Sequence, residues 1–153
     1  MDLYIPNEQK TLAVGSRLAR GLHHGAIIFL SGDMGVGKST LMRGILQGLG
    51  LRLPKNNSRS SYLHSHDVNG LTVHCLDLYL LSDLDDPRFT TALSRLSEPS
   101  AVRIVESPER AHGNLPEPDL HIKFRQGIKG RTLLIESLSE RGSMLVRAVN
   151  AHH

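Results

Sequence analysis

The residues most clearly suited to chemistry form a glycine-rich turn that can hold the phosphates of a nucleotide. Residues 32–39 match the pattern G-x-x-x-x-G-K-[ST] and stand between an expected strand and an expected helix, the context in which this motif binds phosphate. Glycines let successive backbone N–H groups turn inward at the positive end of a helix. We expect Lys38 to reach the β- and γ-phosphates, Ser39 to bind Mg²⁺ through its hydroxyl, and Thr40 to lie near the α-phosphate. The nucleotide-binding residues predicted from the turn are Gly32, Asp33, Gly35, Val36, Gly37, Lys38, Ser39 and Thr40.

Acidic residues near this turn are candidates for completing an NTPase site. Asp77 follows the apolar stretch VHCL, and Glu106 follows VRIV. Either carboxylate could hold Mg²⁺ or orient the attacking water, and either could be an ordinary strand-end acid that binds neighbouring amides. Asp33 is either a turn residue or a carboxylate that faces the γ-phosphate.

The apolar pattern predicts the elements that position these residues. We expect alternating helices and strands in one α/β domain that spans residues 1–153. The two hairpins are expected to turn at Asn69-Gly70 and near residues 127–130. The expected elements are a helix over 7–22, a strand over 26–31, a helix over 39–50 capped by Gly50, a hairpin over 61–79, a weak helix within 82–100, a strand over 101–107 and a hairpin over 115–139.

The composition of the chain restricts the cellular compartment and the class of binding partner that we expect. The chain has 153 residues, of which 39% are hydrophobic, and no apolar run approaches the about 18 residues of a membrane span. The N-terminal residues show no signal peptide, and the single cysteine, Cys75, fits a reducing compartment, so we expect a cytoplasmic protein. The net charge of +3 is compatible with RNA or with an acidic partner, but it is too small and too dispersed to establish either, so direct contact with tRNA stays undecided. None of the nine histidines forms an HExxH-like pair, and we expect them to be solvated rather than metal ligands.

Several segments together resemble the TsaE (YjeE) family. They are SGDMGVGKSTLMRGILQGLG, HCLDLYLL, RIVESPERAHGNLPEPDLHI and the late Arg131, and their order and spacing match over nearly the whole chain. The resemblance implies a P-loop NTPase-like fold with a small mixed central sheet and few flanking helices. It also implies Mg²⁺-dependent hydrolysis of ATP, in complex with TsaB and TsaD, during threonylcarbamoyl-adenosine modification of tRNA. Contact with tRNA would be indirect, through that complex.

The resemblance also assigns roles to residues. Ser39 and Glu106 match the Mg²⁺ contacts of the family, and Asp77 matches the aspartate of its H-x-D-x-Y-R segment. We therefore expect the metal ligands to be Ser39, Glu106 and Asp77, and the catalytic residues to be Lys38 and Asp77. An acid near the N-terminus and a late arginine point to Glu8 and Arg131 at the nucleotide, with Thr11 close by.

Three departures from the family pattern fall around this site. The S-P-T-[FY] switch segment is replaced by residues 59–62, RSSY, which keep a hydroxyl at Ser61 as the candidate γ-phosphate sensor. Leu80 stands where the family has arginine, and Ser107 where it has tryptophan. We expect nucleotide binding to be retained and hydrolysis by the isolated chain to be slow.

Two other functions remain open from the sequence. One is a nucleotide-gated binding module that no longer hydrolyses ATP, which the altered segment 59–62 and Leu80 motivate. The other is a small-molecule P-loop kinase, for which Arg88 and Arg95 would have to serve a lid. No N-K-x-D motif selects GTP, so the sequence leaves the preference between ATP and GTP undecided.

Overall fold

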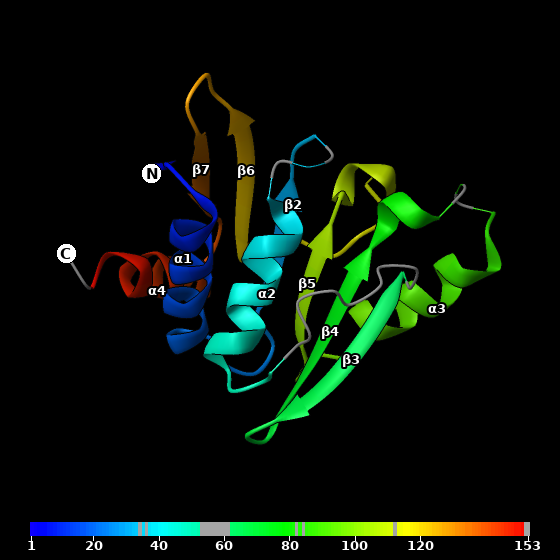
Figure 1. Cartoon of the computed structure of the whole chain (residues 1–153). Coiled ribbons are helices and arrows are strands. Elements are labelled where there is room, and N and C mark those ends of the chain that lie inside the picture. The colour runs from blue at the N-terminus through cyan, green and yellow to red at the C-terminus, as the bar shows by residue number, and fades with distance from the viewer. Residues whose placement is uncertain are drawn as a thin grey trace.

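A mixed seven-stranded sheet forms the centre of the molecule, in the order β1-β7-β6-β2-β5-β4-β3 (Figure 1). The computed structural model describes residues 1–33, 35, 37–52, 62–81, 83, 85–111 and 113–151. The strands are β1 Asp2–Ile5, β2 Ile27–Ser31, β3 Leu63–Val68, β4 Leu71–Asp77, β5 Val102–Glu106, β6 Leu120–Gln126 and β7 Arg131–Ser137. The helices are α1 Glu8–Arg20, α2 Lys38–Gly48, α3 Pro87–Leu96 and α4 Glu140–Asn150, with 3-10 turns η1 Leu78–Leu80 and η2 Pro108–Ala111.

The centre of the sheet is parallel and its edges are antiparallel. Strand β2 pairs in parallel with both β5 and β6, and β5 pairs in parallel with β4. The pairs β3–β4, β6–β7 and β1–β7 are antiparallel. Because parallel strands end at the same edge of a sheet, the segments after β2, β4 and β5 meet at one edge, where ligands bind in open α/β sheets. The expected P-loop fold with a small mixed sheet is confirmed.

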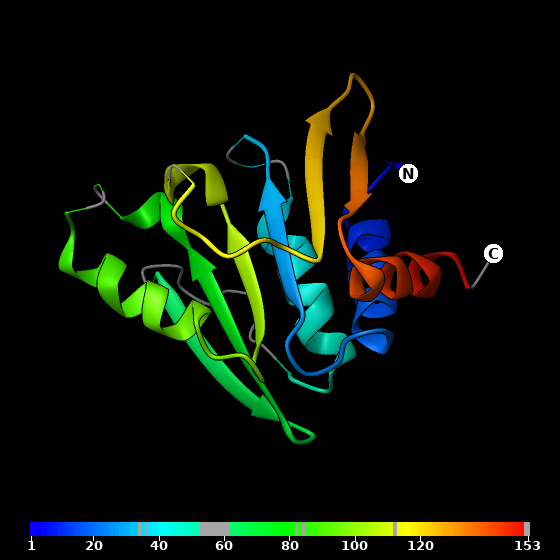
Figure 2. The ribbon, with the colours of Figure 1, turned by 180° about the vertical axis from the view of Figure 1, so that it is seen from behind.

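Helices cover both faces of the sheet and enclose two apolar clusters. Helices α1 and α2 lie over one face, where Leu18 and Ile45 are fully buried with Ile28 and Ile104 of the central strands (Figure 1). Helix α3 lies over the other face, where Phe89 packs with residues of β2, β4 and β5 (Figure 2). All residues of β5 and all but the last residue of β2 are buried, which is typical of parallel strands covered on both sides.

Helices α1 and α2 approach each other backbone to backbone. A Cβ atom added to Gly44 would lie 2.6 Å from Leu12 O, and one added to Gly15 would lie 2.7 Å from Leu41 O. Gly48 faces Ser16 and Ala19 with equally little room. This glycine seam, formed by Gly15, Gly44 and Gly48, brings the first turn of α1 beside the start of α2.

Most of the expected elements are present, and two others were not predicted. The hairpin at Asn69-Gly70 is confirmed, with positive φ angles of 50° and 81° that fit a tight primed turn. Gly50 follows the last turn of α2 with φ 106°, as expected for a glycine cap. Strand β1 and helix α4 were missed, because a four-residue edge strand has too little periodicity to be recognised and α4 follows the last expected hairpin directly.

The expectation that the histidines are solvated is wrong for His74. This side chain is 4% exposed, its Nδ1 lies 2.6 Å from Ser65 Oγ, and its Nε2 lies 2.7 Å from Glu98 Oε2. The hydrogen bond from His74 lowers the pKa of Glu98. His74 therefore links β3 and β4 to the chain after α3 and is a core histidine with both nitrogens satisfied.

Candidate functional site

The glycine-rich turn joins the end of β2 to the start of α2. Gly32, Gly35 and Gly37 have φ angles of 144°, 81° and 107°, which L side chains rarely adopt, so the glycines are required by the path of the chain. Gly37 is the N-cap of α2 and no side chain caps the helix there, so the first N–H groups of α2 are directed to the turn. Met34 and Val36 lie outside the described residues, and the role of Val36 stays a prediction.

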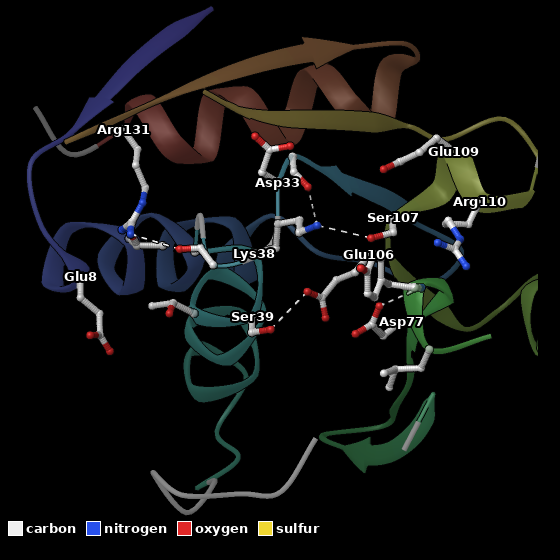
Figure 3. Close-up of a pocket in the computed structure, with 17 residues that line it drawn as sticks. Glu8, Asp33, Lys38, Ser39, Asp77, Glu106, Ser107, Glu109, Arg110 and Arg131 are labelled. Carbon is white, nitrogen blue, oxygen red and sulfur yellow. Dashed lines mark hydrogen bonds between the residues drawn. The ribbon is translucent and has the colours of Figure 1, made fainter. Parts of the chain in front are cut away.

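Lys38 extends across the turn from the first position of α2. Its Nζ donates to Gly32 O at 2.6 Å and to Ser107 Oγ at 3.3 Å (Figure 3). The ammonium group is thus held between the P-loop backbone and the chain after β5. Ser107 reaches it from a left-handed backbone conformation, with φ 58°.

Ser39 and the two strand-end acids form a set of oxygen donors. Ser39 Oγ donates to Glu106 Oε1 at 3.2 Å, and Asp77 is the direct register partner of Glu106 across β4 and β5. Asp77 Oδ1 also accepts from Tyr79 N at 3.1 Å. A hydroxyl and carboxylates are the ligands that Mg²⁺ prefers, so the residues present fit a magnesium ion.

The carboxylate of Glu106 also affects the pKa of Cys75 on the neighbouring strand β4. Burial raises the pKa of the Cys75 thiol on β4, and the negative charge of Glu106 raises it further. Glu106 itself is 6% exposed, so its carboxylate stands at the buried end of the site.

The residues predicted at the nucleotide from outside the turn also come to this edge. Glu8 Oε1 forms an ion pair with Arg43 Nη2 of α2 at 2.6 Å. Thr11 is buried, and its hydroxyl donates to Asn7 O at 3.4 Å. Arg131 donates through Nη2 to Gly35 O at 3.3 Å, which joins the start of β7 to the turn.

One cavity of about 690 Å³ collects these side chains. Figure 3 shows Glu8 and Arg131 on one side of Lys38, and Glu106 and Asp77 on the other. The predicted residues that line the cavity are Glu8, Thr11, Gly32, Asp33, Gly35, Gly37, Lys38, Ser39, Thr40, Asp77, Glu106 and Arg131. Ser61, the candidate switch residue, lies outside the described residues, so its role also stays a prediction.

The cavity also contains residues that were not predicted for the site. Tyr79, Leu80, Ser107, Glu109 and Arg110 line it as well. Leu80 and Ser107 had been recognised only as departures from the family pattern, whereas Glu109 and Arg110 lie on η2 directly after β5. Both belong to the segment RIVESPERAHGNLPEPDLHI that carries the family resemblance, but no role was predicted for either.

Arg110 is the most informative of these additions. Its guanidinium lies over the Tyr79 ring, 5.1 Å from the ring centroid, and donates to Leu81 O at 3.0 Å. The loss of arginine at position 80 therefore does not leave this side of the cavity without a cation.

Among the described residues, no helix is long and apolar enough to cross a membrane.

Comparison with known proteins places the chain in a family. Residues 5–133 match the family model described as "Threonylcarbamoyl adenosine biosynthesis protein TsaE". A tRNA threonylcarbamoyladenosine biosynthesis protein TsaE from Streptomyces coelicolor is 51% identical over 139 residues, which cover 84% of this chain and 90% of the relative. The protein of the same name from Haemophilus influenzae is 27% identical over 150 residues, covering 95% of this chain and 94% of the relative.

A solved structure supports the fold. The crystal structure of YdiB from Bacillus subtilis superposes with a TM-score of 0.79 at 23% sequence identity, covering 99% of this chain and 95% of that one. The match of the family model over most of the chain and the 51% identity to the Streptomyces coelicolor protein agree with the P-loop geometry. The chain therefore belongs to the TsaE family of P-loop nucleotide-binding proteins.

Proposed function

We propose that this chain is a Mg²⁺-dependent ATPase that acts with TsaB and TsaD in threonylcarbamoyl-adenosine modification of tRNA. Its family supports the pathway, because the relatives are named for tRNA threonylcarbamoyladenosine biosynthesis. The observation that carries the ATPase proposal is the hydrogen bond between Ser39 and Glu106, which places a hydroxyl and a carboxylate together beside Lys38. The whole of residues 1–153 would act as one P-loop ATPase domain.

The binding roles follow from the position of each group. The backbone of residues 35–40 would wrap the phosphates, with Lys38 Nζ moving from Gly32 O to a phosphate oxygen. Ser39 and Glu106 would bind Mg²⁺ directly, and Asp77 would reach it through a water molecule; Mg²⁺ neutralises charge on the phosphates when it is bound. Glu8, Thr11 and Arg131 would meet the nucleotide from the other wall of the cavity.

Asp77 is our candidate for placing the attacking water. One carboxylate oxygen accepts from Tyr79 N, which fixes the orientation of the group at the end of β4. The other oxygen can accept a hydrogen bond from water and draw it toward the γ-phosphate. Lys38 would stabilise the charge that develops on the transferred phosphoryl group.

Partner binding would complete the site. In P-loop enzymes a residue supplied by a partner adds about 10³ to 10⁵ in rate. TsaB and TsaD would fill this role and connect the chain to tRNA indirectly, which places its work in the cytoplasm. The uncovered rim residues Tyr79 and Leu80, which are 48% and 36% exposed, stand where a partner could reach the cavity.

The decisive test is phosphate release from ATP and Mg²⁺, by the chain alone and with TsaB and TsaD from the same source. We expect slow turnover alone, faster turnover in the complex, and no turnover by Lys38→Ala in either setting. ATP binding with no turnover in the complex would reject the ATPase proposal and leave a nucleotide-gated binding module. Turnover that requires an added small-molecule acceptor would instead identify a kinase.

A further inference from the structure

Three side chains with nitrogen or sulfur donor atoms meet on the β3–β4 hairpin, outside the set that lines the cavity. They are His64 and His66 of β3 and Cys75 of β4. One donor atom from each lies within 4.8 Å of the other two. Among the residues that the structure describes, no other group of three histidine, cysteine or acidic side chains gathers in this way.

The register of the hairpin brings the three side chains together. His64 is the direct antiparallel partner of Cys75, and such partners have Cβ atoms about 4.5–5.5 Å apart on one face of the sheet. His66 lies two residues further along β3 and so projects from the same face. The primed turn at Asn69-Gly70 fixes this register, because a slip of one residue would send the side chains of one strand to the opposite face.

The cluster runs from the core to the surface. Cys75 is 1% exposed and belongs to the apolar cluster beneath α2, whereas the two histidines are partly exposed. His64 Nδ1 lies 2.8 Å from His66 Nε2, and the two rings meet edge to face. The two facing imidazole nitrogens thus lie close together, and one donor atom of each histidine lies within 4.8 Å of the thiol sulfur.

We propose that His64, His66 and Cys75 form a binding site for a borderline-soft divalent cation of the Zn²⁺ class. Imidazole nitrogen and thiolate sulfur are the ligands that Zn²⁺ takes in proteins, at about 2.0–2.1 Å for nitrogen and about 2.3 Å for sulfur. Tetrahedral ligands at those bond lengths stand roughly 3.3–3.6 Å apart. The imidazoles would separate by roughly half an ångström and the thiol would approach by no more than about 1.5 Å, which side-chain rotation can supply.

Binding of the cation changes the protonation of all three side chains. Each imidazole offers an unprotonated nitrogen, with its proton on the other ring nitrogen, so the His64–His66 hydrogen bond is exchanged for two bonds to the cation. To bind as thiolate, the Cys75 thiol must release its proton to solvent; burial and Glu106 oppose this by raising its pKa, and the charge of the bound cation has to offset that cost. Three protein ligands leave the fourth tetrahedral position to water or to another ligand.

This site differs in chemistry from the proposed magnesium site next to it. Its donors are nitrogen and sulfur, whereas Ser39, Glu106 and Asp77 offer only oxygen, which suits a harder cation. Cys75 and Asp77 are two residues apart on β4, so the two sites would lie side by side on one face of the sheet. A cation on the cluster would cross-link the edge strand β3 to the strand that carries Asp77.

The test is titration of the full chain with Co²⁺, a spectroscopic substitute for Zn²⁺, in excess Mg²⁺ and without nucleotide. Cys75 is the only cysteine of the chain, so a thiolate-to-cobalt charge-transfer band in the near ultraviolet can arise only from this residue. We expect the band to saturate at one Co²⁺ for each chain and to disappear when Zn²⁺ is added. Because the test contains no nucleotide and measures no turnover, its outcome is independent of the proposed ATPase.

Variants separate the cluster from other histidines. Cys75→Ser should abolish the band, and His66→Ala, which changes a partly exposed residue, should weaken binding of the cation at least about tenfold while the circular dichroism spectrum stays unchanged. The matched control is the double variant His23→Ala/His24→Ala, which should keep both the band and the affinity. Absence of the band in the folded wild-type chain, or Zn²⁺ affinity that depends on His23 and His24 rather than on His66, would overturn the proposal.

Discussion

Lys38 and Ser39 are neighbours in the chain, but the groups that they contact come from far along it. Lys38 Nζ reaches Ser107, and Ser39 reaches Glu106, both at the end of β5. At the scale of single residues, these two contacts hold the start of α2 against the end of β5. Glu106 and Asp77 occupy equivalent positions on adjacent strands, yet only Glu106 contacts Ser39 directly, and this difference separates their expected roles.

Glu106→Gln keeps the size of the side chain and removes its charge. If Glu106 holds Mg²⁺, binding of Mg²⁺–ATP should weaken at least about tenfold, or about 1.4 kcal/mol, whereas binding of ATP in EDTA should change little. Calorimetric titration with and without Mg²⁺ measures both quantities. The control is Glu136→Gln on the exposed side of β7, which should change neither; equal losses with and without metal would remove Glu106 from the metal site.

Asp77→Asn tests the placement of water. The amide keeps an oxygen that accepts from Tyr79 N, so the end of β4 should keep its conformation. We expect turnover in the complex with TsaB and TsaD to fall at least about 10²-fold while the affinity for ATP is nearly unchanged. A large loss of affinity instead would make Asp77 a binding residue.

At the scale of elements, the site depends on how closely α1 approaches α2. Glu8 and Thr11 lie in the first turn of α1 and line the cavity only because the glycine seam lets the helices meet at their backbones. The ion pair between Glu8 and Arg43 spans the same two helices. Side chains at the seam would push the first turn of α1 away from the P-loop.

Gly44→Ala should therefore destabilise the protein, although alanine favours a helix by about 0.8–1.0 kcal/mol over glycine. The new Cβ would lie 2.6 Å from Leu12 O, and a backbone atom cannot move away as a flexible side chain can. We expect a net loss of roughly 1–3 kcal/mol in the free energy of unfolding, measured with urea. Gln47→Ala on the exposed side of α2 is the control and should cost less than about 0.5 kcal/mol; no loss in Gly44→Ala would show that the helices can separate freely.

A titratable histidine near the start of β6, His121, contacts Ser31 at the end of β2. Burial lowers the pKa of His121 from its ordinary value of 6.5, and the positive charge of Lys123 lowers it further. In the folded protein His121 Nε2 lies 2.7 Å from the Oγ atom of Ser31, the residue before the glycine-rich turn. Because its folded-state pKa is below its unfolded value, the unfolded chain binds more protons in acid.

Stability should consequently fall as pH decreases below about 6.5. Replacing His121 with glutamine removes this titration, so the free energy of unfolding of His121→Gln should depend less steeply on pH between about 7 and 5. Urea unfolding across that range measures the slope for both proteins. Identical slopes would exclude His121 as a source of acid sensitivity.

At the scale of the whole molecule, a nucleotide would join the two halves of the chain. The cavity is lined from α1, the P-loop, η1, the end of β5 and the start of β7, so a ligand there contacts elements from residue 8 to residue 131. A ligand that binds only the folded state stabilises all of them together.

ATP with Mg²⁺ at about one hundred times its dissociation constant should add about 2.7 kcal/mol to the free energy of unfolding. For a chain of 153 residues this corresponds to a rise of roughly 5–10 °C in Tm, which differential scanning calorimetry measures. Lys38→Ala should lose most of the rise at the same ATP concentration. A rise that persists unchanged in Lys38→Ala would place the nucleotide outside the P-loop.

The sequence alone determined the features that depend on short stretches of chain. The phosphate-binding turn, the hairpin at Asn69-Gly70 and the cap at Gly50 each follow from the backbone freedom of a few residues. The alternation of helices and strands, and with it the fold, followed from local apolar patterns and from the resemblance to TsaE. The extent of the domain and the roles of the site residues stay predictions.

Only the tertiary structure decided which distant residues meet. Pairing of β4 with β5 placed Asp77 beside Glu106, and the position of η2 after β5 brought Arg110 to the cavity, a residue for which the sequence predicted no role. Pairing of β3 with β4 set His64 opposite Cys75, and burial made His74 a core residue. These contacts depend on strand register and on the packing of helices over the sheet, which involve residues far apart in the chain and leave no local signal.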